Sequence, residues 1–237
     1  AASLPLLLLF WRKWIREKAF TSLVIFIVIN LIFSYMFGTL AYAITLWLLL
    51  GMYTLFEIFI PWIGWKKACQ ISASFSLGII LWALTNTWWI IPLFFVLPSL
   101  ASTQHSVGNT VLTLFAIGVQ SIIPYSLPGL NSFYLFQNLE LGEVFKHPLF
   151  LFIPYLGVFF IIMGIYYTIK KRELIFWSIL FIIAVFLAKG VAFPLGYFYA
   201  YFFKKFFFLG LLRNPFEKFG LLIPFAGSVL FAIGFFR

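Results

Sequence analysis

The chain has 237 residues, of which 64% are hydrophobic, 23% aromatic and 9% charged, and its mean hydropathy is +1.10. Soluble globular domains carry charge on about 25% of their residues, so this composition excludes a soluble domain and indicates an integral membrane protein. The formal charge of +10 comes mostly from basic residues clustered between apolar runs, a pattern that indicates membrane topology and argues against nucleic acid as a partner.

The first apolar run, residues 4–10, is followed directly by basic residues. A helix that crosses a bilayer needs about 20 apolar residues. We therefore expect this run to be the last part of a span that begins upstream, and the chain to be a fragment of a larger membrane protein.

Long apolar runs and basic clusters alternate along the rest of the chain. They predict six full spans, at residues 20–37, 40–60, 71–92, 149–169, 174–188 and 219–236. The predicted fold class is therefore all-α, a polytopic transmembrane helical bundle of about six full spans plus a partial N-terminal one. No repeat or flexible linker interrupts it, so residues 1–237 are expected to form a single domain.

The basic clusters also predict the orientation of the bundle. Ten of the sixteen basic residues lie on one side of this threading, at positions 12–18, 66–67, 170–172 and 237. The positive-inside rule places that side in the cytoplasm, so segments 93–147 and 189–218 are extracytoplasmic, on the outer face of the cell membrane. The second segment is rich in Tyr and Phe, and we expect it to contain a helix that lies in the outer interface.

Several kinds of site are not predicted. The chain has no aspartate, and it has no P-loop, HExxH or CxxC motif that would indicate a nucleotide or zinc site. Its two histidines, His105 and His147, stand far apart. Glu57 lies deep in an expected span, and we expect it to reach the cytoplasmic interface or to pair with a lysine.

A charged motif precedes the last expected span, in the sequence Leu212-Arg213-Asn214-Pro215-Phe216-Glu217-Lys218-Phe219. Proline suits the first turn of a helix, and the free amides beyond it attract anions. Arg213, Asn214 and Lys218 are therefore predicted to hold a phosphate or pyrophosphate. The alternative is that Glu217 merely pairs with Arg213 four residues earlier and the motif only begins a helix.

A second candidate site follows the expected span at residues 71–92. Asn86 is a polar residue near the outer end of that span, and a buried amide must be hydrogen-bonded. In a cavity it would orient a sugar hydroxyl or a carboxylate while Trp89 stacks on the sugar ring. Trp88 is interpreted as an ordinary interfacial tryptophan.

Three segments, 86–92, 190–196 and 212–219, resemble in order and rough spacing the later membrane region of GT-C-type polytopic glycosyltransferases. The nearest resemblance is to YfhO-like bacterial membrane proteins and to arabinofuranosyltransferase relatives, and it covers the chain from about residue 70 onward. It implies an enzyme that takes a sugar from a polyprenyl-phosphate donor and transfers it to a glycan or protein acceptor outside the membrane. Arg213 and Lys218 would then stabilise the leaving phosphate, with Glu217 orienting one of them.

The catalytic base of that family lies in an early outer loop that this sequence does not contain. The base, and any divalent metal, would have to come from residues outside this chain. Two other functions therefore stay open. A transporter or flippase would pass a lipid-linked anion through the same cavity without breaking it, and a non-catalytic membrane scaffold would tolerate alanine at Arg213 and Lys218.

Overall fold

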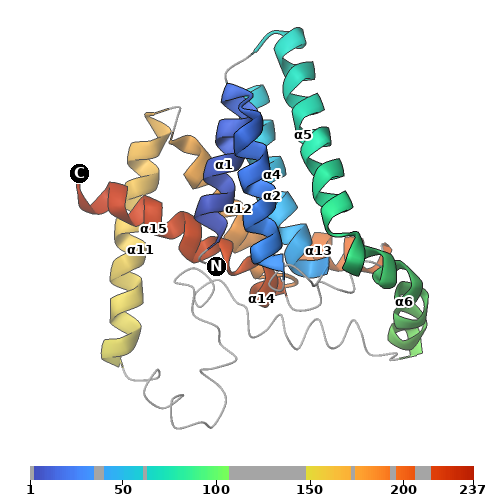
Figure 1. Ribbon diagram of the computed structural model, residues 1–237. Coiled ribbons are helices and arrows are strands. Elements are labelled where there is room, and N and C mark those ends of the chain that lie inside the picture. The colour runs from blue at the N-terminus through green and yellow to red at the C-terminus, as the bar shows by residue number, and fades with distance from the viewer. Residues whose placement is uncertain are drawn as a thin grey trace. The chain divides into compact units, whose positions relative to one another are not determined.

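The computed structural model describes residues 3–34, 40–60, 63–106, 148–171, 174–192, 196–205 and 215–237. Within these ranges the regular structure is entirely α-helical (Figure 1), which confirms the all-α class for this part of the chain. The turn expected at residues 38–39 and most of the segment 93–147 lie outside the described residues.

Three of the described helices are long and apolar enough to cross a membrane. The qualifying stretches are Ala41–Phe59, Trp65–Thr85 and Phe152–Ile169. Shorter apolar helices are found at Phe20–Ile32, Thr87–Val96, Ile175–Ala188 and Leu222–Phe235. These helices indicate a membrane protein, as the composition predicts.

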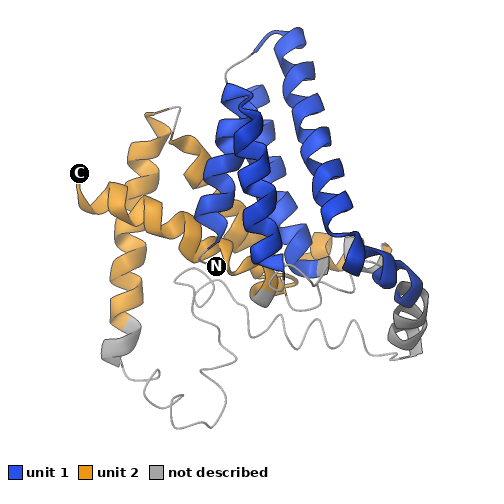
Figure 2. Cartoon of the chain, in the orientation of Figure 1, with its two compact units in different colours: residues 1–102 blue, residues 103–237 orange. Residues whose placement is uncertain are grey.

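The chain divides into two compact units, residues 1–102 and residues 103–237 (Figure 2). Unit 1 holds helices α1 (Leu4–Glu17), α2 (Phe20–Ile32), α4 (Leu40–Phe59), α5 (Trp65–Thr85) and most of α6 (Thr87–Ser106). Unit 2 holds α11 (Pro148–Ile169), α12 (Ile175–Ala188), α13 (Gly196–Lys205), α14 (Pro215–Phe219) and α15 (Leu222–Phe235).

Helix α1 extends beyond the first apolar run and contains three of the four basic residues expected to follow that run, Arg12, Lys13 and Arg16. Arginine and lysine favour helical backbone, and no breaker interrupts the sequence before Glu17. The helix ends at Lys18, whose backbone is left-handed with φ of 57° and whose N–H donates to the carbonyl of Trp14 at 3.1 Å. This cap turns the chain sharply into α2.

The core of unit 1 is built around Trp11, whose side chain is completely buried. Its ring lies 5.2 Å from that of Phe26, 5.5 Å from Trp47 and 5.8 Å from Phe75, so α1, α2, α4 and α5 all contribute. Gly78 makes room for it, because a Cβ at that position would lie 2.5 Å from Trp11 Cη2. The Trp11 indole N–H donates to Thr54 Oγ1 at 3.2 Å.

The span expected at residues 71–92 differs in the structure. The helix begins earlier, at Trp65, because the lysines that follow favour helical backbone. It ends at Thr85, and Asn86 forms a turn before α6, which continues through Pro92. Figure 1 shows the chain changing direction here. The Asn86 amide bonds back to the Trp82 carbonyl at 2.9 Å, which explains a break without glycine or proline.

Unit 2 is held together by close contact between helix backbones, with α15 crossing α11 (Figure 1). A Cβ at Gly164 of α11 would lie 2.0 Å from the carbonyl oxygen of Leu230. A Cβ at Gly234 of α15 would lie 2.0 Å from the carbonyl oxygen of Phe160. Glycine is therefore required at both positions, since any larger residue would separate the helices.

The last expected span, 219–236, is shorter in the structure. Pro215 begins α14, which has only five residues, and the final helix α15 begins separately at Leu222. The Gly220 N–H donates to the Phe216 carbonyl at 2.8 Å and closes α14. The aromatic segment at residues 189–218 contains a helix, at Gly196–Lys205.

Candidate functional site

The structure describes three of the six predicted site residues completely. Asn86 and Trp89 belong to unit 1, and Lys218 belongs to unit 2. Arg213 and Asn214 lie outside the described residues. Glu217 lies in α14, but its side chain also falls outside the described part, so the Arg213 to Glu217 pair is not addressed.

Asn86 is fully buried, and both ends of its amide are hydrogen-bonded within unit 1. Its oxygen accepts from the indole N–H of Trp89 at 3.0 Å, and its nitrogen donates to the carbonyl of Trp82 at 2.9 Å. Trp89 is also buried, with 8% of its surface exposed. This geometry ties the two residues to each other and favours a structural role over the expected contact with a sugar.

Asn86 and Trp89 belong to a larger polar and aromatic cluster. Asn30 of α2 is completely buried, and its amide oxygen accepts from the indole N–H of Trp82 at 2.8 Å. The Trp82 ring lies 6.0 Å from that of Trp89 and 5.4 Å from that of Trp47. The sequence signal for this cluster is Asn30, a single asparagine inside the apolar run 20–37, which was not predicted to be part of a site.

Two donors of this cluster have no acceptor among the described residues. They are the amide nitrogen of Asn30 and the indole nitrogen of Trp47. A buried donor without an acceptor costs about 1 to 3 kcal/mol, so these two groups lower the stability of the cluster.

In unit 2, the turn after α12 contains a buried lysine, Lys189. Lys189 is 1% exposed, and its ammonium donates to the Ala192 carbonyl at 2.9 Å and lies 4.5 Å from the centroid of the Phe186 ring. Burial lowers the pKa of this ammonium below its ordinary value. We missed Lys189 from the sequence, where its position directly after a long apolar run is the available signal.

The turn at residues 189–192 packs against both short helices of unit 2. Gly190 has φ of +57°, and a Cβ there would lie 2.4 Å from Cγ of Pro215 at the start of α14. A Cβ at Gly196, at the start of α13, would lie 1.9 Å from the Val191 carbonyl oxygen. The structure therefore brings together two of the three segments on which the resemblance rests.

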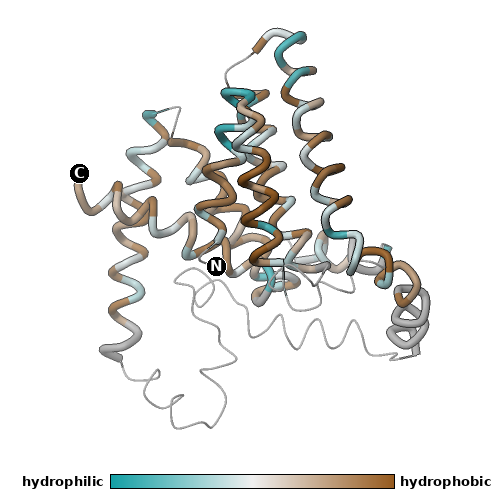
Figure 3. The backbone as a smooth tube through the Cα atoms, in the orientation of Figure 1, coloured by the Kyte–Doolittle hydropathy of each residue, from teal (hydrophilic) through white to brown (hydrophobic). Residues whose placement is uncertain are grey.

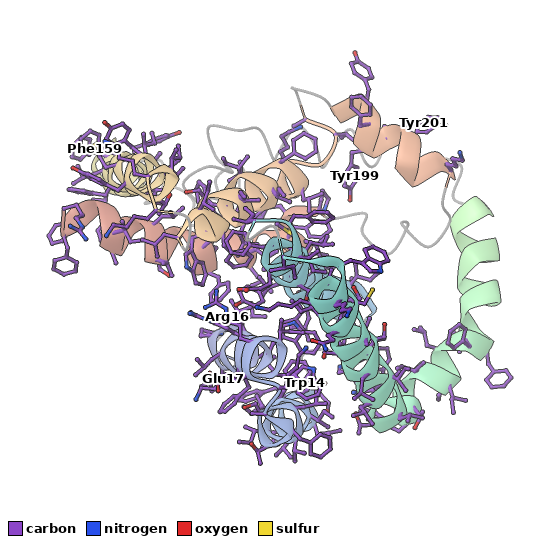
Figure 4. All side chains as sticks on the ribbon, turned by 90° about the horizontal axis from the view of Figure 1, so that it is seen from above. Trp14, Arg16, Glu17, Phe159, Tyr199 and Tyr201 are labelled. Carbon is purple, nitrogen blue, oxygen red and sulfur yellow. The ribbon has the colours of Figure 1, made fainter. Side chains whose placement is uncertain are left out.

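Helix α13 covers the other side of this turn. Val191 packs against Tyr199 and Ala200, and Figure 4 shows Tyr199 and Tyr201 projecting from α13. Burial raises the pKa of the Tyr199 hydroxyl above its ordinary value. Tyr201 is exposed.

Lys218 is half-buried in α14, between the buried residues Pro215 and Phe219. The predicted anion site also invoked the N-terminus of a long final helix. The structure has a helix of only five residues there, Pro215–Phe219, which supplies little of the dipole of a long helix. An affinity for phosphate in this region would therefore depend mainly on side-chain cations.

Glu57 pairs with an arginine, whereas one of the two expectations for it was a lysine. Its Oε1 atom accepts from Arg16 Nε at 2.8 Å, lies 2.7 Å from Arg16 Nη2, and accepts from the Tyr53 hydroxyl at 2.5 Å. The partner is an arginine because α1 packs beside α4 and carries Arg16 to the level of Glu57. Figure 4 looks onto this end of α1 and labels Trp14, Arg16 and Glu17.

Within the described ranges, no group of three or more His, Cys, Asp or Glu side chains is arranged to hold a metal ion. Comparison of the chain with family models, with curated proteins and with solved structures found no match. The function therefore has to be argued from the residues and their geometry.

Proposed function

We propose that this chain is the membrane-embedded part of a GT-C-like glycosyltransferase that binds a polyprenyl-phosphate-linked sugar at an extracytoplasmic cavity. The observation that carries the proposal is the packing of Gly190 against Pro215. This contact brings the buried ammonium of Lys189 into the same part of unit 2 as α14, which carries Lys218. The product would be a cell-envelope glycan or a glycoprotein.

The cations would act on the phosphate of the donor. When the bond between the sugar and the polyprenyl phosphate breaks, negative charge develops on the leaving phosphate. Arg213 and Lys218 would donate charge-assisted hydrogen bonds to its oxygens, with Asn214 beside them and Glu217 orienting one of the cations. Lys189 would position the turn and add positive potential. The base that activates the acceptor would come from residues outside this chain.

The proposal includes a bundle of six membrane spans. It requires α2, α12 and α15, which have 13, 14 and 14 residues, to cross together with the three long helices. A 14-residue helix is about 21 Å long, against about 30 Å of hydrocarbon, so apolar flanking residues would have to complete each crossing. Segments 93–147 and 189–218 would then lie outside the cell membrane.

Binding of a polyprenyl phosphate by the purified chain in detergent tests the proposal. Arg213→Ala and Lys218→Ala should each weaken binding about tenfold, which corresponds to about 1.4 kcal/mol. Lys170→Ala is the matched control, because Lys170 is an exposed lysine at the end of α11, on the predicted cytoplasmic side. Wild-type binding by both test variants would contradict the proposal and favour a scaffold.

A transporter or flippase for a lipid-linked anion is the second candidate. The observation in its favour is the break at Asn86, which divides one apolar stretch into α5 and α6, since transporters build their sites from interrupted helices. Movement of a labelled polyprenyl-phosphate sugar across proteoliposomes, with no loss of the sugar, would support transport over transfer.

A further inference from the structure

A strongly basic surface lies at the end of unit 1 where α1 ends and α5 begins, and we call it the basic end. Figure 3 shows hydrophilic residues gathered there. It carries six cations, Arg12, Lys13, Arg16, Lys18, Lys66 and Lys67, and two carboxylates, Glu17 and Glu57. Since Arg16 pairs with Glu57 at 2.7 Å, Glu17 alone faces the other cations of this set.

Two helices far apart in sequence build this surface, and Lys18 joins them. Its ammonium donates to Ser74 Oγ at 2.6 Å and to the Gln70 carbonyl at 3.3 Å. The indole N–H of Trp14 donates to the Ser74 carbonyl at 3.0 Å. The end of α1 is therefore fixed against α5 at Gln70 and Ser74, about one and two turns beyond Lys66.

This arrangement places like charges close together at a cost. Lys66 and Lys67 occupy the first turn of α5, which has no acidic residue, and cations there oppose the helix dipole. Burial lowers the pKa of the Lys18 ammonium, and repulsion from the charge of Lys67 lowers it further. Repulsion of this kind is relieved when an anion binds between the cations.

The basic end lies beside the ends of long apolar helices, and this position favours a lipid head group as the anion. The long apolar helices α4 and α5 end and begin beside it, at Phe59 and Trp65, so it lies at the edge of the hydrophobic part of unit 1. Trp65 is 82% exposed, and exposed tryptophans beside a span lie at the level of lipid head groups. Arg12, Lys13, Lys66 and Lys67 are also exposed.

We propose that the basic end of unit 1 binds the head groups of anionic phospholipids, with Lys18, Lys66 and Lys67 around one phosphate and Arg12 and Lys13 at its margin. Clusters of four to eight cations directly beside a membrane span attract anionic lipid in this way. The inference does not depend on the proposed transferase, whose cations lie in unit 2.

Native mass spectrometry of the full 237-residue chain in detergent, titrated with phosphatidylglycerol or phosphatidylcholine, tests this site. The double variant Lys66→Gln/Lys67→Gln should bind phosphatidylglycerol about tenfold more weakly and phosphatidylcholine unchanged. Lys66→Arg/Lys67→Arg keeps the charge and should bind like wild type. Added salt should weaken phosphatidylglycerol binding to the wild type, because it screens exposed charges.

Lys170→Gln/Lys171→Gln is the matched control, because it removes the same charge from two exposed lysines at the end of α11 in unit 2. An equal loss of phosphatidylglycerol in this control would overturn the proposal, since it would show an effect of net charge alone. Unchanged binding by the Lys66/Lys67 double glutamine variant would also overturn it. Displacement of the lipid by excess inorganic phosphate would indicate a site for a soluble anion instead.

Discussion

The two units of this chain pack their helices by different means. Unit 1 joins helices through large side chains and polar bonds, such as the Trp11 indole on Thr54 and the Trp82 indole on Asn30. Unit 2 joins α11 and α15 through glycines that let the backbones touch, at Gly164 and Gly234.

The difference shows two solutions to one physical problem. Lipid tails are as apolar as leucine, so helices in a membrane gain little from burying apolar surface against each other. Hydrogen bonds between side chains contribute to the attraction in unit 1, and close backbone contact contributes to it between α11 and α15 of unit 2. Each solution should fail under a different kind of substitution.

The largest effect is expected from Gly164→Ala. The added Cβ would lie 2.0 Å from the Leu230 carbonyl oxygen, so α11 and α15 must separate, at a cost of about 3 kcal/mol. Trp177 is the single tryptophan between residues 103 and 237, and its ring lies 5.5 Å from that of Phe225 in α15. Fluorine NMR of fluorotryptophan-labelled protein during denaturation would therefore report on unit 2.

Gly157→Ala is the control for this prediction, because a Cβ at Gly157 meets no atom within 4 Å. It should leave the unfolding midpoint unchanged or raise it slightly, since alanine favours helix over glycine. If Gly164→Ala and Gly157→Ala behaved alike, the close contact between α11 and α15 would be refuted.

Removing the carboxylate of Glu57 should have the next largest effect. Glu57→Ala leaves the guanidinium of Arg16 and the Tyr53 hydroxyl without this acceptor, and we expect a loss of about 2 kcal/mol. The loss stays below that of a fully buried pair because the Arg16 side chain is 38% exposed. Chemical denaturation in detergent measures it. Glu17→Ala, which removes an exposed acid near the same end of α1, should cost less than about 0.5 kcal/mol.

Helix ends were predictable from the sequence where a proline or a charge stands beside an apolar run. The apolar runs 149–169 and 174–188 form the helices Pro148–Ile169 and Ile175–Ala188, whose ends lie within one residue of those expected. Proline suits the first turn of α11, and Lys189 interrupts the apolar run at the end of α12. In these places local chemistry alone determines the boundary.

Contacts between helices were not predictable in the same way. Glu57 and Arg16 are 41 residues apart, and no local pattern specifies that α1 lies beside α4. The break at Asn86 likewise depends on what its amide contacts once the helices have packed. For the same reason the burial of Lys189 could not be read from its neighbours in sequence.

Asn86→Leu should have a smaller effect than loss of Glu57. It removes the acceptor of the Trp89 indole and the donor to the Trp82 carbonyl. It also removes the bond from the Asn86 amide to Asn30 Oδ1 of α2 at 3.4 Å, and a side-chain bond between membrane helices contributes about 1 kcal/mol. Thr87→Val, which removes a hydroxyl bonded only locally to Leu84, is the control. If Asn86→Leu lost polyprenyl-phosphate binding without losing stability, Asn86 would instead belong to the binding site for that lipid.

The smallest effect is expected from the pH dependence of unit 2 stability through Lys189. Burial lowers the pKa of Lys189 in the folded state below its ordinary value of 10.5. Between these two values the unfolded chain binds a proton that the folded chain does not, so stability should rise with pH up to 10.5. Lys189→Met removes the titrating group and should flatten this rise, whereas Lys171→Met, at an exposed lysine, should keep it. Unfolding midpoints of Trp177 measured from neutral pH upward give the comparison. Parallel curves for wild type and Lys189→Met would contradict the prediction. They would mean that the bond to Ala192 and the other contacts of the Lys189 ammonium stabilise its charge to the same extent as water does, so that its pKa is not lowered.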